Sequence, residues 1–410
     1  MISTPTCQGC GASLTRTLVD LGLQPLANSY VSPERASVPD RLYPLHARVC
    51  DNCLLVQVDR IVPPGEIFSD YAYFSSYSDS WLQHCKRYVE MARSRFALDS
   101  ESKVVEIASN DGYLLQYVKS AGIPCLGVEP AANVAEVARA NGIPTDVAFF
   151  GEATAKRLLD DGHAADLVIS NNVLAHVPEI DDFVAGVSLI LKPQGVYSVE
   201  FPHLLNLIEK TQFDTIYHEH FTYLSVLAIE RIFARNGLRI FDIEEVPTHG
   251  GSLRVFACLR NAAHALSPNV ARVRDKEIAR RLDRPEGYAD FTQRVDRVRV
   301  DFLTFLKDLK SAGKRVVGYG AAAKGNTLFN YCHVSSEDIS FVADRSLAKQ
   351  GKFLPGSRIP VLSPDAIEQE KPDYVFIVPW NLREEIMDQL AGIHNWGGRF
   401  VTAIPEITIA

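Results

Sequence analysis

The stretch that decides the fold is Val104-Val105-Glu106-Ile107-Ala108-Ser109-Asn110-Asp111-Gly112. Its first four residues are typical of a buried strand, and the Asn-Asp-Gly near its end is typical of a tight loop. Outward from it the pattern repeats, with a helix at 113–121, a strand at 125–129 and further strands at 166–170 and 195–199. Strands that alternate with helices predict an α/β fold with a doubly wound, Rossmann-like sheet.

The loop after the first strand differs from a dinucleotide-binding loop. Such a loop uses glycines to bring a helix N-terminus close to a pyrophosphate, whereas Ala108 and Asn110 occupy the first two glycine positions here. The acidic Glu106 lies near the end of the strand. This combination suits a cofactor that has a cationic amino-acid end and no phosphate, so we predict an S-adenosylmethionine site. An ordinary strand–turn–helix junction is the alternative.

The predicted cofactor site extends to the ends of the neighbouring strands. Glu129 closes the second strand, where an acidic residue can accept hydrogen bonds from both ribose hydroxyls. Asn171 and Asn172 follow the strand at 166–170, where the adenosylmethionine-binding fold usually contacts its donor. The predicted cofactor-binding residues are Glu106, Ala108, Asn110, Gly112, Tyr113, Glu129, Asn171 and Asn172.

Two Cys-x-x-Cys pairs lie before this sheet, at Cys7 and Cys10 and at Cys50 and Cys53. Four thiolates in two matched pairs predict a tetrahedral zinc site, which is structural because no coordination position stays open. Reduced buried thiols and a redox pair are the alternatives. We expect a small zinc module over residues 1–70, with strands at 42–49 and 54–58.

Composition limits the class of protein. A chain of 410 residues is expected to form two or three domains. The net charge is −8 without a basic tract, which argues against a nucleic-acid partner. No apolar run approaches the ~18 residues of a membrane span, and the first residues do not resemble a secretory signal. We therefore expect a cytoplasmic protein without a membrane partner. We also expect a monomer.

The segment Tyr217-His218-Glu219-His220 concentrates acid–base groups more than packing requires. Proton abstraction is one use of such a segment. If the segment were a strand, His218 and His220 would share a face and could bind a metal ion. However, no carboxylate–histidine pair at a suggestive spacing downstream completes a metal site.

A second α/β unit follows a charged helical stretch at 270–312. It opens with Gly318-Tyr319-Gly320-Ala321-Ala322-Ala323-Lys324-Gly325 and continues with strands at 339–343, 374–378 and 399–401. The Gly-x-Gly-x-x-Ala pattern is compatible with NAD(P), and its helix N-terminus with Lys324 is equally compatible with the diphosphate of a nucleotide sugar.

Between the two units lie a helix at 225–236, ended by Gly237, and strands at 238–245 and 252–259. The turn joining the strands, Thr248-His249-Gly250-Gly251-Ser252, offers additional backbone donors or is a plain hairpin turn.

Four features occur in one order: the cysteine pairs, the loop at 106–112, the segment at 217–220 and the loop at 318–325. In this combination the chain resembles the S-adenosylmethionine-dependent sugar C-3′-methyltransferases of antibiotic deoxysugar biosynthesis. The resemblance implies a zinc module (1–70), an adenosylmethionine-binding catalytic domain (71–260) and a Rossmann-like nucleotide-sugar domain without required NAD (261–410). It also implies a dTDP-linked 4-keto-deoxysugar as substrate.

Methylating a sugar carbon beside a C-4 ketone requires a base that removes the C-3 proton and donors that stabilise the enolate. The resemblance favours His220 as this base and Tyr217 as the donor to the enolate oxygen. Glu219 would orient the sugar, and His176 would line the cleft. The substrate-binding residues implied are Tyr71, Tyr73, His249, Gly250, Gly251, Ser252 and Lys324.

Two other functions remain open. One is a bifunctional C-methyltransferase and NADPH-dependent 4-ketoreductase, for which Asp344-Arg345 is the only candidate ribose-binding pair. The other is a non-catalytic nucleotide-sugar-binding protein, against which the intact segment at 217–220 argues.

Overall fold

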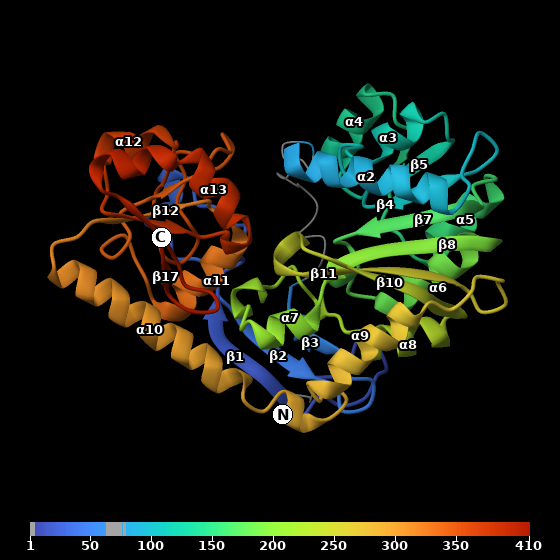
Figure 1. Ribbon diagram of the computed structural model, residues 1–410, viewed down its shortest axis with the longest axis horizontal. Coiled ribbons are helices and arrows are strands. Elements are labelled where there is room, and N and C mark those ends of the chain that lie inside the picture. Colours follow the sequence, from blue (N-terminus) through green and yellow to red (C-terminus); the bar gives the residue numbers. More distant parts are fainter. Residues whose placement is uncertain (1–4, 63–75, 77–78) are drawn as a thin grey trace.

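The computed structural model describes residues 5–62, 76 and 79–410. The predicted contacts Tyr71 and Tyr73 lie outside these described residues, as does the predicted domain boundary at residue 70. Figure 1 shows two lobes that diverge from a common base. One lobe holds the central sheet, the other holds the C-terminal sheet, and strands from the N-terminal part lie at the base.

The central lobe contains a seven-stranded sheet in the order β10-β11-β8-β7-β4-β5-β6. Its strands are β4 (Val104–Ile107), β5 (Cys125–Val128), β6 (Thr145–Asp146), β7 (Ala165–Asn171), β8 (Leu191–Pro202), β10 (Leu238–Val246) and β11 (Ser252–Leu259). The strands from β6 to β8 are parallel, and β11 inserts antiparallel between β8 and β10. The predicted α/β sheet is confirmed.

Helices cover both faces of this sheet because alternate strand residues point to opposite sides. Val104 packs with α2 and α3, while the next residue, Val105, packs with α5, α6 and α8 (Figure 1). The helices of this lobe are α2 (Asp79–Arg95), α3 (Leu115–Ser120), α4 (Ala132–Ala140), α5 (Glu152–Asp160), α6 (Ile180–Ile190), α7 (Leu204–Glu209), α8 (Val226–Arg235) and α9 (Pro268–Ala279).

The order of strands reverses at β4, which has β5 on one side and β7 on the other. In open α/β sheets, ligands bind at the carboxyl ends of the strands where this reversal occurs. The loops after β4, β5 and β7 therefore meet at one edge of the sheet. These loops carry the predicted cofactor residues.

A second, antiparallel sheet has the order β1-β2-β3-β9. Its strands are β1 (Arg16–Gln24), β2 (Tyr43–Val49), β3 (Val56–Val58) and β9 (Thr222–Tyr223). The sequence analysis missed β1, because irregular register after Thr17 and after Asp20 breaks the alternation of buried and exposed residues. The strand β9 directly follows the segment at 217–220, so this sheet joins the N-terminal part to that segment.

The C-terminal lobe holds a six-stranded sheet in the order β14-β13-β12-β15-β16-β17. Its strands are β12 (Val316–Tyr319), β13 (Val342–Ala343), β14 (Val361–Leu362), β15 (Tyr374–Ile377), β16 (Arg399–Thr402) and β17 (Thr408–Ile409). Its helices are α10 (Phe291–Ser311), α11 (Ala323–Cys332), α12 (Asp365–Glu370) and α13 (Arg383–Gln389). The helical stretch predicted at 270–312 is not continuous, because a turn with Pro285 and Gly287 separates α9 from α10.

The base belongs to both lobes. Residues of β1 and β2 share one hydrophobic core with α7, α10 and α11. The main chain of Val31 forms a β-bridge with Phe353, and the Asn326 amide donates to the Ala27 carbonyl at 2.5 Å. Among the described helices, none is long and apolar enough to cross a membrane.

Candidate active site

The four cysteines of the two pairs converge. The Sγ atoms of Cys7 and Cys53 are 3.5 Å apart, as are those of Cys10 and Cys50, and all four lie within 4.8 Å of one another. Zn–S bonds of about 2.3 Å in a tetrahedron place sulfurs about 3.8 Å apart. The Gln57 amide also donates to the Cys7 sulfur at 3.1 Å, which stabilises a thiolate. The donor set and its spacing therefore fit a zinc ion.

The loop after β4 folds back on the end of β5. Ala108 and Asn110 have positive φ values of 53° and 49°, so the chain turns sharply after the strand. The carboxylate of Glu129 accepts from the Asn110 N–H at 2.9 Å and from the Ala131 N–H at 2.9 Å. Gly112, with φ 81°, is held against Ile143, where a Cβ would lie 3.0 Å from its side chain. The predicted residues thus form one compact loop.

Three carboxylates surround this loop. Burial raises the pKa of Glu106 well above its ordinary value, the neighbouring Asp111 and Glu129 raise it further, and the Tyr113 hydroxyl opposes the rise. Burial also raises the pKa of Glu129, against the two backbone N–H groups that stabilise its charge. A cation at this edge of the sheet would relieve the repulsion among the acids. The site therefore suits a ligand with an ammonium or sulfonium group.

The end of β7 adds polar groups that need a partner. Asn171 is 6% exposed, and neither polar atom of its side chain has a hydrogen-bond partner among the described residues. Asn172, with φ 56°, places its amide nitrogen 3.1 Å from His249 Nε2. Buried amides are normally hydrogen-bonded, so Asn171 indicates a ligand position.

The segment at 217–220 is a turn, closed by a hydrogen bond of 3.0 Å from the His220 N–H to the Tyr217 carbonyl. The strand required by the metal-binding alternative is therefore not formed. His218 Nε2 donates to the Pro44 carbonyl at 3.2 Å, and its ring packs against Tyr43. His218 thus ties the turn to β2, whereas His220 points elsewhere.

The contacts of His220 fix its tautomer. Its Nδ1 lies 2.8 Å from the Thr215 carbonyl, which can only accept, so Nδ1 carries the hydrogen. Nε2 then has a free electron pair and accepts from the Tyr217 hydroxyl at 2.8 Å. Burial lowers the pKa of His220 well below its ordinary value, and the adjacent His176 lowers it further. The imidazole is therefore neutral near pH 7, with Nε2 available as a base.

Two other predicted residues lie close to His220. The His176 ring centroid is 4.7 Å from that of His220, and burial lowers the His176 pKa to about 4. Glu219 is 6% exposed and accepts from the Asn28 amide at 3.2 Å, and burial raises its pKa. Asn28 was not predicted, because it precedes Glu219 by 191 residues and belongs to no motif.

The turn between β10 and β11 is more constrained than a plain hairpin. Gly250 has φ 88°, and a Cβ there would lie 2.4 Å from the Trp380 ring. Gly251 has φ 117°, and a Cβ there would collide with Asn206. Ser252 is buried, and its hydroxyl donates within the turn to the Thr248 carbonyl at 2.9 Å. His249 is exposed, so it is the side chain of this turn that can reach a ligand.

The C-terminal lobe brings Lys324 to the same region. Its Nζ donates to Asn381 Oδ1 at 2.6 Å and lies 4.4 Å above the Trp380 ring. Burial lowers the Lys324 pKa, and the nearby Asp214 carboxylate opposes the shift. Trp380 Nε1 donates to Asp214 at 2.7 Å. The sequence analysis missed Asp214 and Trp380, which no motif marks.

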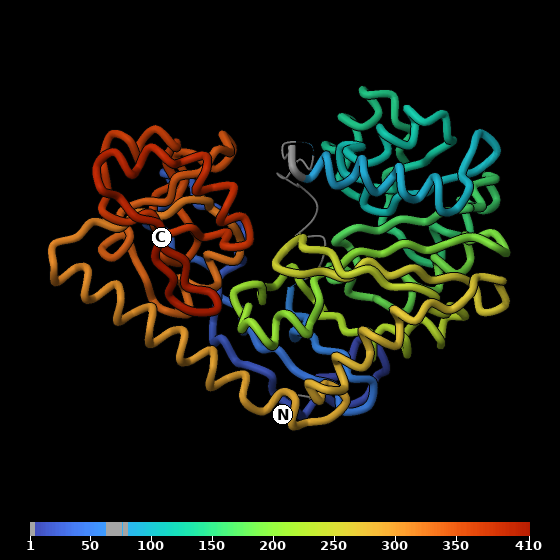
Figure 2. Tube along the Cα trace, in the orientation of Figure 1, coloured from blue at the N-terminus to red at the C-terminus, as the bar shows by residue number. Residues whose placement is uncertain are grey.

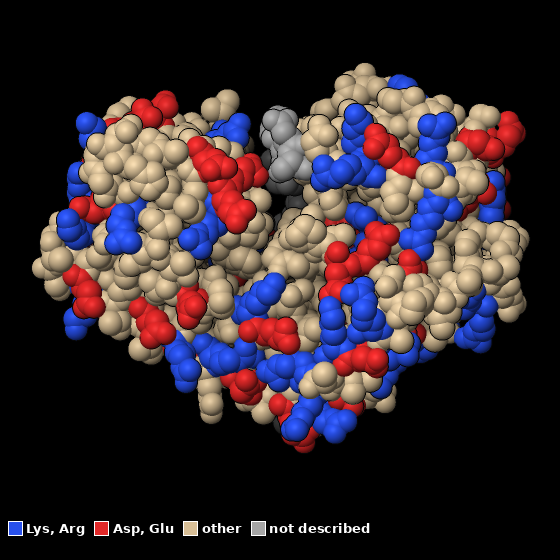
Figure 3. Space-filling view, viewed as in Figure 1, with Lys and Arg blue, Asp and Glu red and all other residues tan. Residues whose placement is uncertain are grey.

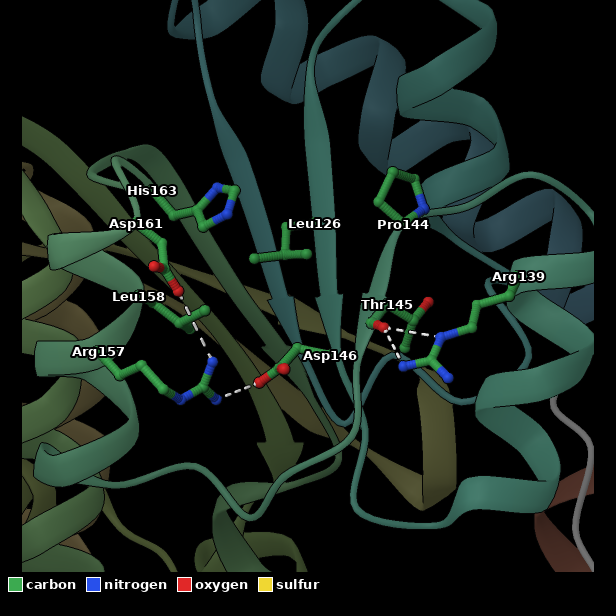
Figure 4. Close-up of a pocket in the computed structure, with 9 residues that line it drawn as sticks. All are labelled: Leu126, Arg139, Pro144, Thr145, Asp146, Arg157, Leu158, Asp161 and His163. Carbon is green, nitrogen blue, oxygen red and sulfur yellow. Dashed lines mark hydrogen bonds and ion pairs between the residues drawn. The ribbon is translucent and has the colours of Figure 1, made fainter.

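The surface between the lobes is hollowed (Figure 3). Gly250, Gly251 and Trp380 line a cavity of about 350 Å³ between the hairpin turn, the end of α7 and the C-terminal lobe. A second hollow of about 390 Å³ lies at the β6 edge and contains none of the predicted residues (Figure 4). There Arg157 pairs with Asp146 and Asp161, and Arg139 donates to the Thr145 carbonyl, so the charged side chains of that hollow already have partners.

The second nucleotide-type loop resembles the first in one respect. Asp344, which follows β13, accepts from the Ala321 N–H at 2.7 Å, as Glu129 does from Asn110. The glycines of this second loop also have a packing role, because a Cβ on Gly320 would lie 2.5 Å from Pro379.

Comparisons with known proteins agree with this architecture. Three family models match, described as a zinc binding domain (7–68), a methyltransferase domain (81–243) and a C-methyltransferase C-terminal domain (247–405). C-methyltransferase NovU of Streptomyces niveus is 36% identical over 400 residues, or 98% of this chain and 95% of that protein. A ubiquinone biosynthesis O-methyltransferase of Bartonella bacilliformis is 27% identical over 95 residues, covering 23% of this chain and 38% of that protein.

Among solved structures, magnesium protoporphyrin IX methyltransferase (ChlM) from Synechocystis with bound SAH is 16% identical, with a TM-score of 0.35. The match covers 43% of this chain and 82% of ChlM, and its TM-score is too low to support a conclusion. The match to NovU over almost the full length and the three family models do support a conclusion. This chain is an enzyme of the S-adenosylmethionine-dependent C-methyltransferase family, with S-adenosylmethionine as its cofactor and a structural zinc ion in its four-cysteine module.

Proposed function

We propose that the enzyme methylates C-3′ of a dTDP-linked 4-keto-deoxysugar through an enolate. The observation that carries the proposal is the pair Tyr217 and His220, in which Nε2 of a neutral imidazole faces a phenol hydroxyl at 2.8 Å. The resemblance to sugar C-3′-methyltransferases supports the substrate. A base beside a hydrogen-bond donor is the pair of groups that enolate formation needs.

In this proposal His220 Nε2 takes the C-3 proton, and the electron pair of the C–H bond moves into an enolate whose charge rests on the C-4 oxygen. The Tyr217 hydroxyl turns from Nε2 to that oxygen. The Thr215 carbonyl, 2.8 Å from Nδ1, stabilises the imidazolium that forms. The enolate charge beside this imidazolium compensates for the low basicity that burial imposes.

When bound, S-adenosylmethionine supplies an electrophilic methyl group to the C-3 carbanion. The residues that would hold it are those around the loop after β4. Glu106 and Asp111 would favour its cationic end, and Glu129 would accept from its ribose hydroxyls. Asn171 would supply the amide that lacks a partner. The contact between Asn172 and His249 joins this edge of the sheet to the cleft that holds His220.

The other residues would position the sugar nucleotide. Lys324 would contact its diphosphate through its ammonium group. Burial and the Lys324 charge lower the pKa of His249 to about 4, so His249 would contact the diphosphate as a neutral ring that donates from Nδ1. Glu219 would orient the sugar from the buried end of the cleft. His176 would shield the base from water, because its neutral ring packs edge-on against His220.

One observation favours a second candidate, an additional NADPH-dependent reduction of the C-4 ketone. Asp344 takes the place in the second loop that Glu129 takes in the first. Against it, Gly320 and Gly325 are needed for packing against Pro379 and Val378, so the glycine pattern has an explanation without a dinucleotide. Tight binding of NADPH would support the second candidate, and binding of S-adenosylmethionine alone would support the first.

The test of the proposed function is incubation with isotopically labelled S-adenosylmethionine and a panel of dTDP-4-keto-sugars. We expect one labelled methyl group at C-3′ of the product, located by mass spectrometry and NMR. Transfer to an oxygen atom, or to no sugar of the panel, would contradict the proposal.

A further inference from the structure

Two non-glycine residues, Asn172 and His249, hold left-handed backbone conformations and contact each other. Asn172, after β7, has φ 56°, and His249, between β10 and β11, has φ 53°. The Asn172 amide donates to His249 Nε2 at 3.1 Å. Positive φ is uncommon for such residues and persists only where the surroundings enforce it.

Both sides of this contact are held by one residue, Glu200 on β8. Its backbone carbonyl accepts from the Asn172 N–H at 2.7 Å. Its side-chain Oε1 accepts from the Thr248 hydroxyl, next to His249, at 2.7 Å. Because β8 lies between β7 and β11, Glu200 can reach the turns that follow β7 and precede β11.

The carboxylate of Glu200 is itself held in place. It is fully buried, and its Oε2 lies 2.9 Å from Arg254 Nη2 and 3.0 Å from His84 Nε2. Burial would raise the pKa of Glu200, but bonds from His84 and Thr248 and the Arg254 charge outweigh it and lower the pKa. The group therefore stays ionised and is a strong acceptor for the Thr248 hydroxyl.

We propose that Glu200 is a positioning residue that holds His249 against Asn172, and that His249 acts on the reaction only from this position. The inference rests on the proposed function for the role of His249 in the reaction. The tube view shows the β10–β11 turn directed toward the space between the lobes (Figure 2). A residue that anchors this turn to the end of β7 therefore fixes the position of the substrate side of the cleft relative to the methyl-donor side.

The hydroxyl of Thr248 is the cleanest place to test this role. Thr248→Val removes the bond to Glu200 and keeps the side-chain shape, while the ion pair of Glu200 with Arg254 is untouched. Thr248→Ser restores the hydroxyl and is the matched control. Replacing Glu200 itself would leave Arg254 buried without a partner and would endanger folding.

The first measurement does not depend on any sugar substrate. The chain has 11 histidines, and NMR of ¹⁵N-labelled histidine rings identifies His249 by the signals that His249→Ala removes. We expect the His249 signals of Thr248→Ser to match the wild type, and those of Thr248→Val to move toward the signals of a histidine whose Nε2 has lost the bond from Asn172. Unchanged signals in Thr248→Val would overturn the inference.

The second measurement is methyl transfer in a double-mutant cycle. We expect Thr248→Val to lower kcat/KM by about ten- to a hundredfold, as for loss of a hydrogen bond to a charged group. Combined with His249→Ala it should add nothing, because Thr248 acts through His249. If Thr248→Val lowered kcat/KM by the same factor in the wild-type and in the His249→Ala background, the inference would be overturned. If the wild-type protein methylates no keto-sugar, the proposed function fails, while the NMR result still decides whether Glu200 positions His249.

Discussion

At the scale of single residues, the tautomer of His220 decides whether it can act as a base. The Thr215 carbonyl assigns the hydrogen to Nδ1 and leaves Nε2 to Tyr217. Both members of this pair were named from the sequence, because structural packing does not require a phenol and an imidazole three residues apart. The sequence could not identify the tautomer, which depends on a backbone carbonyl.

Tyr217→Phe tests the donor to the enolate oxygen. The ring packing against His220 is kept while the hydroxyl is lost, so we expect kcat to fall about 100- to 1,000-fold, as for other donors to a developing oxyanion. Binding of S-adenosylhomocysteine, measured by calorimetry, should not change.

Tyr223→Phe is the matched control for this substitution. Its ring lies 6.1 Å from His220, at the edge of the same site. We expect turnover within a fewfold of wild type. Equal losses in the two variants would mean that Tyr217 has no special role.

At the scale of elements, the zinc module is joined to the proposed catalytic turn at 217–220 through the strand that follows it. The strand β3 pairs with β9, which begins two residues after His220, with Gln57 opposite Thr222. Gln57 in turn donates to the Cys7 sulfur. The module therefore holds one end of the turn at 217–220.

Cys50→Ser should remove the zinc ion and weaken this support. We expect zinc content, measured by mass spectrometry, to fall from one ion per chain to well below one, together with a lower melting temperature and slower methyl transfer. Cys125→Ser, on β5 and outside the cluster, is the control and should keep its zinc. A Cys50→Ser protein with full zinc content would contradict the assignment.

The elements differed in how far the sequence predicted them. The strands β4, β5 and β7 were predicted because they are short apolar runs bounded by turn residues. The strand β1 was missed because its bulges hide the alternation, and the break between α9 and α10 was missed because charged residues continue across Pro285. The convergence of the two cysteine pairs could be predicted from their Cys-x-x-Cys spacing alone.

At the scale of the whole molecule, the site lies where three separate parts of the chain meet. The bond between Asp214 and Trp380 spans 166 residues, and the bond between Asn28 and Glu219 spans 191. Such pairings have no signal in one sequence, because Asp214 and Trp380 belong to no motif and nothing in the sequence connects Asn28 to the segment that holds Glu219. The sequence therefore predicted the candidate acid–base groups, while the residues that contact them emerged only from the fold.

The central claim is that His220 removes the C-3 proton, and solvent exchange measures this step most directly. With S-adenosylhomocysteine bound, methyl transfer is blocked, and deuterium from D₂O should enter C-3 of a dTDP-4-keto-sugar at a rate that NMR can follow. His220→Asn should lose this exchange by at least about a hundredfold, in the range of general-base catalysis. The same substitution two residues away, His218→Asn, should keep it. Exchange at the wild-type rate in His220→Asn would contradict the account.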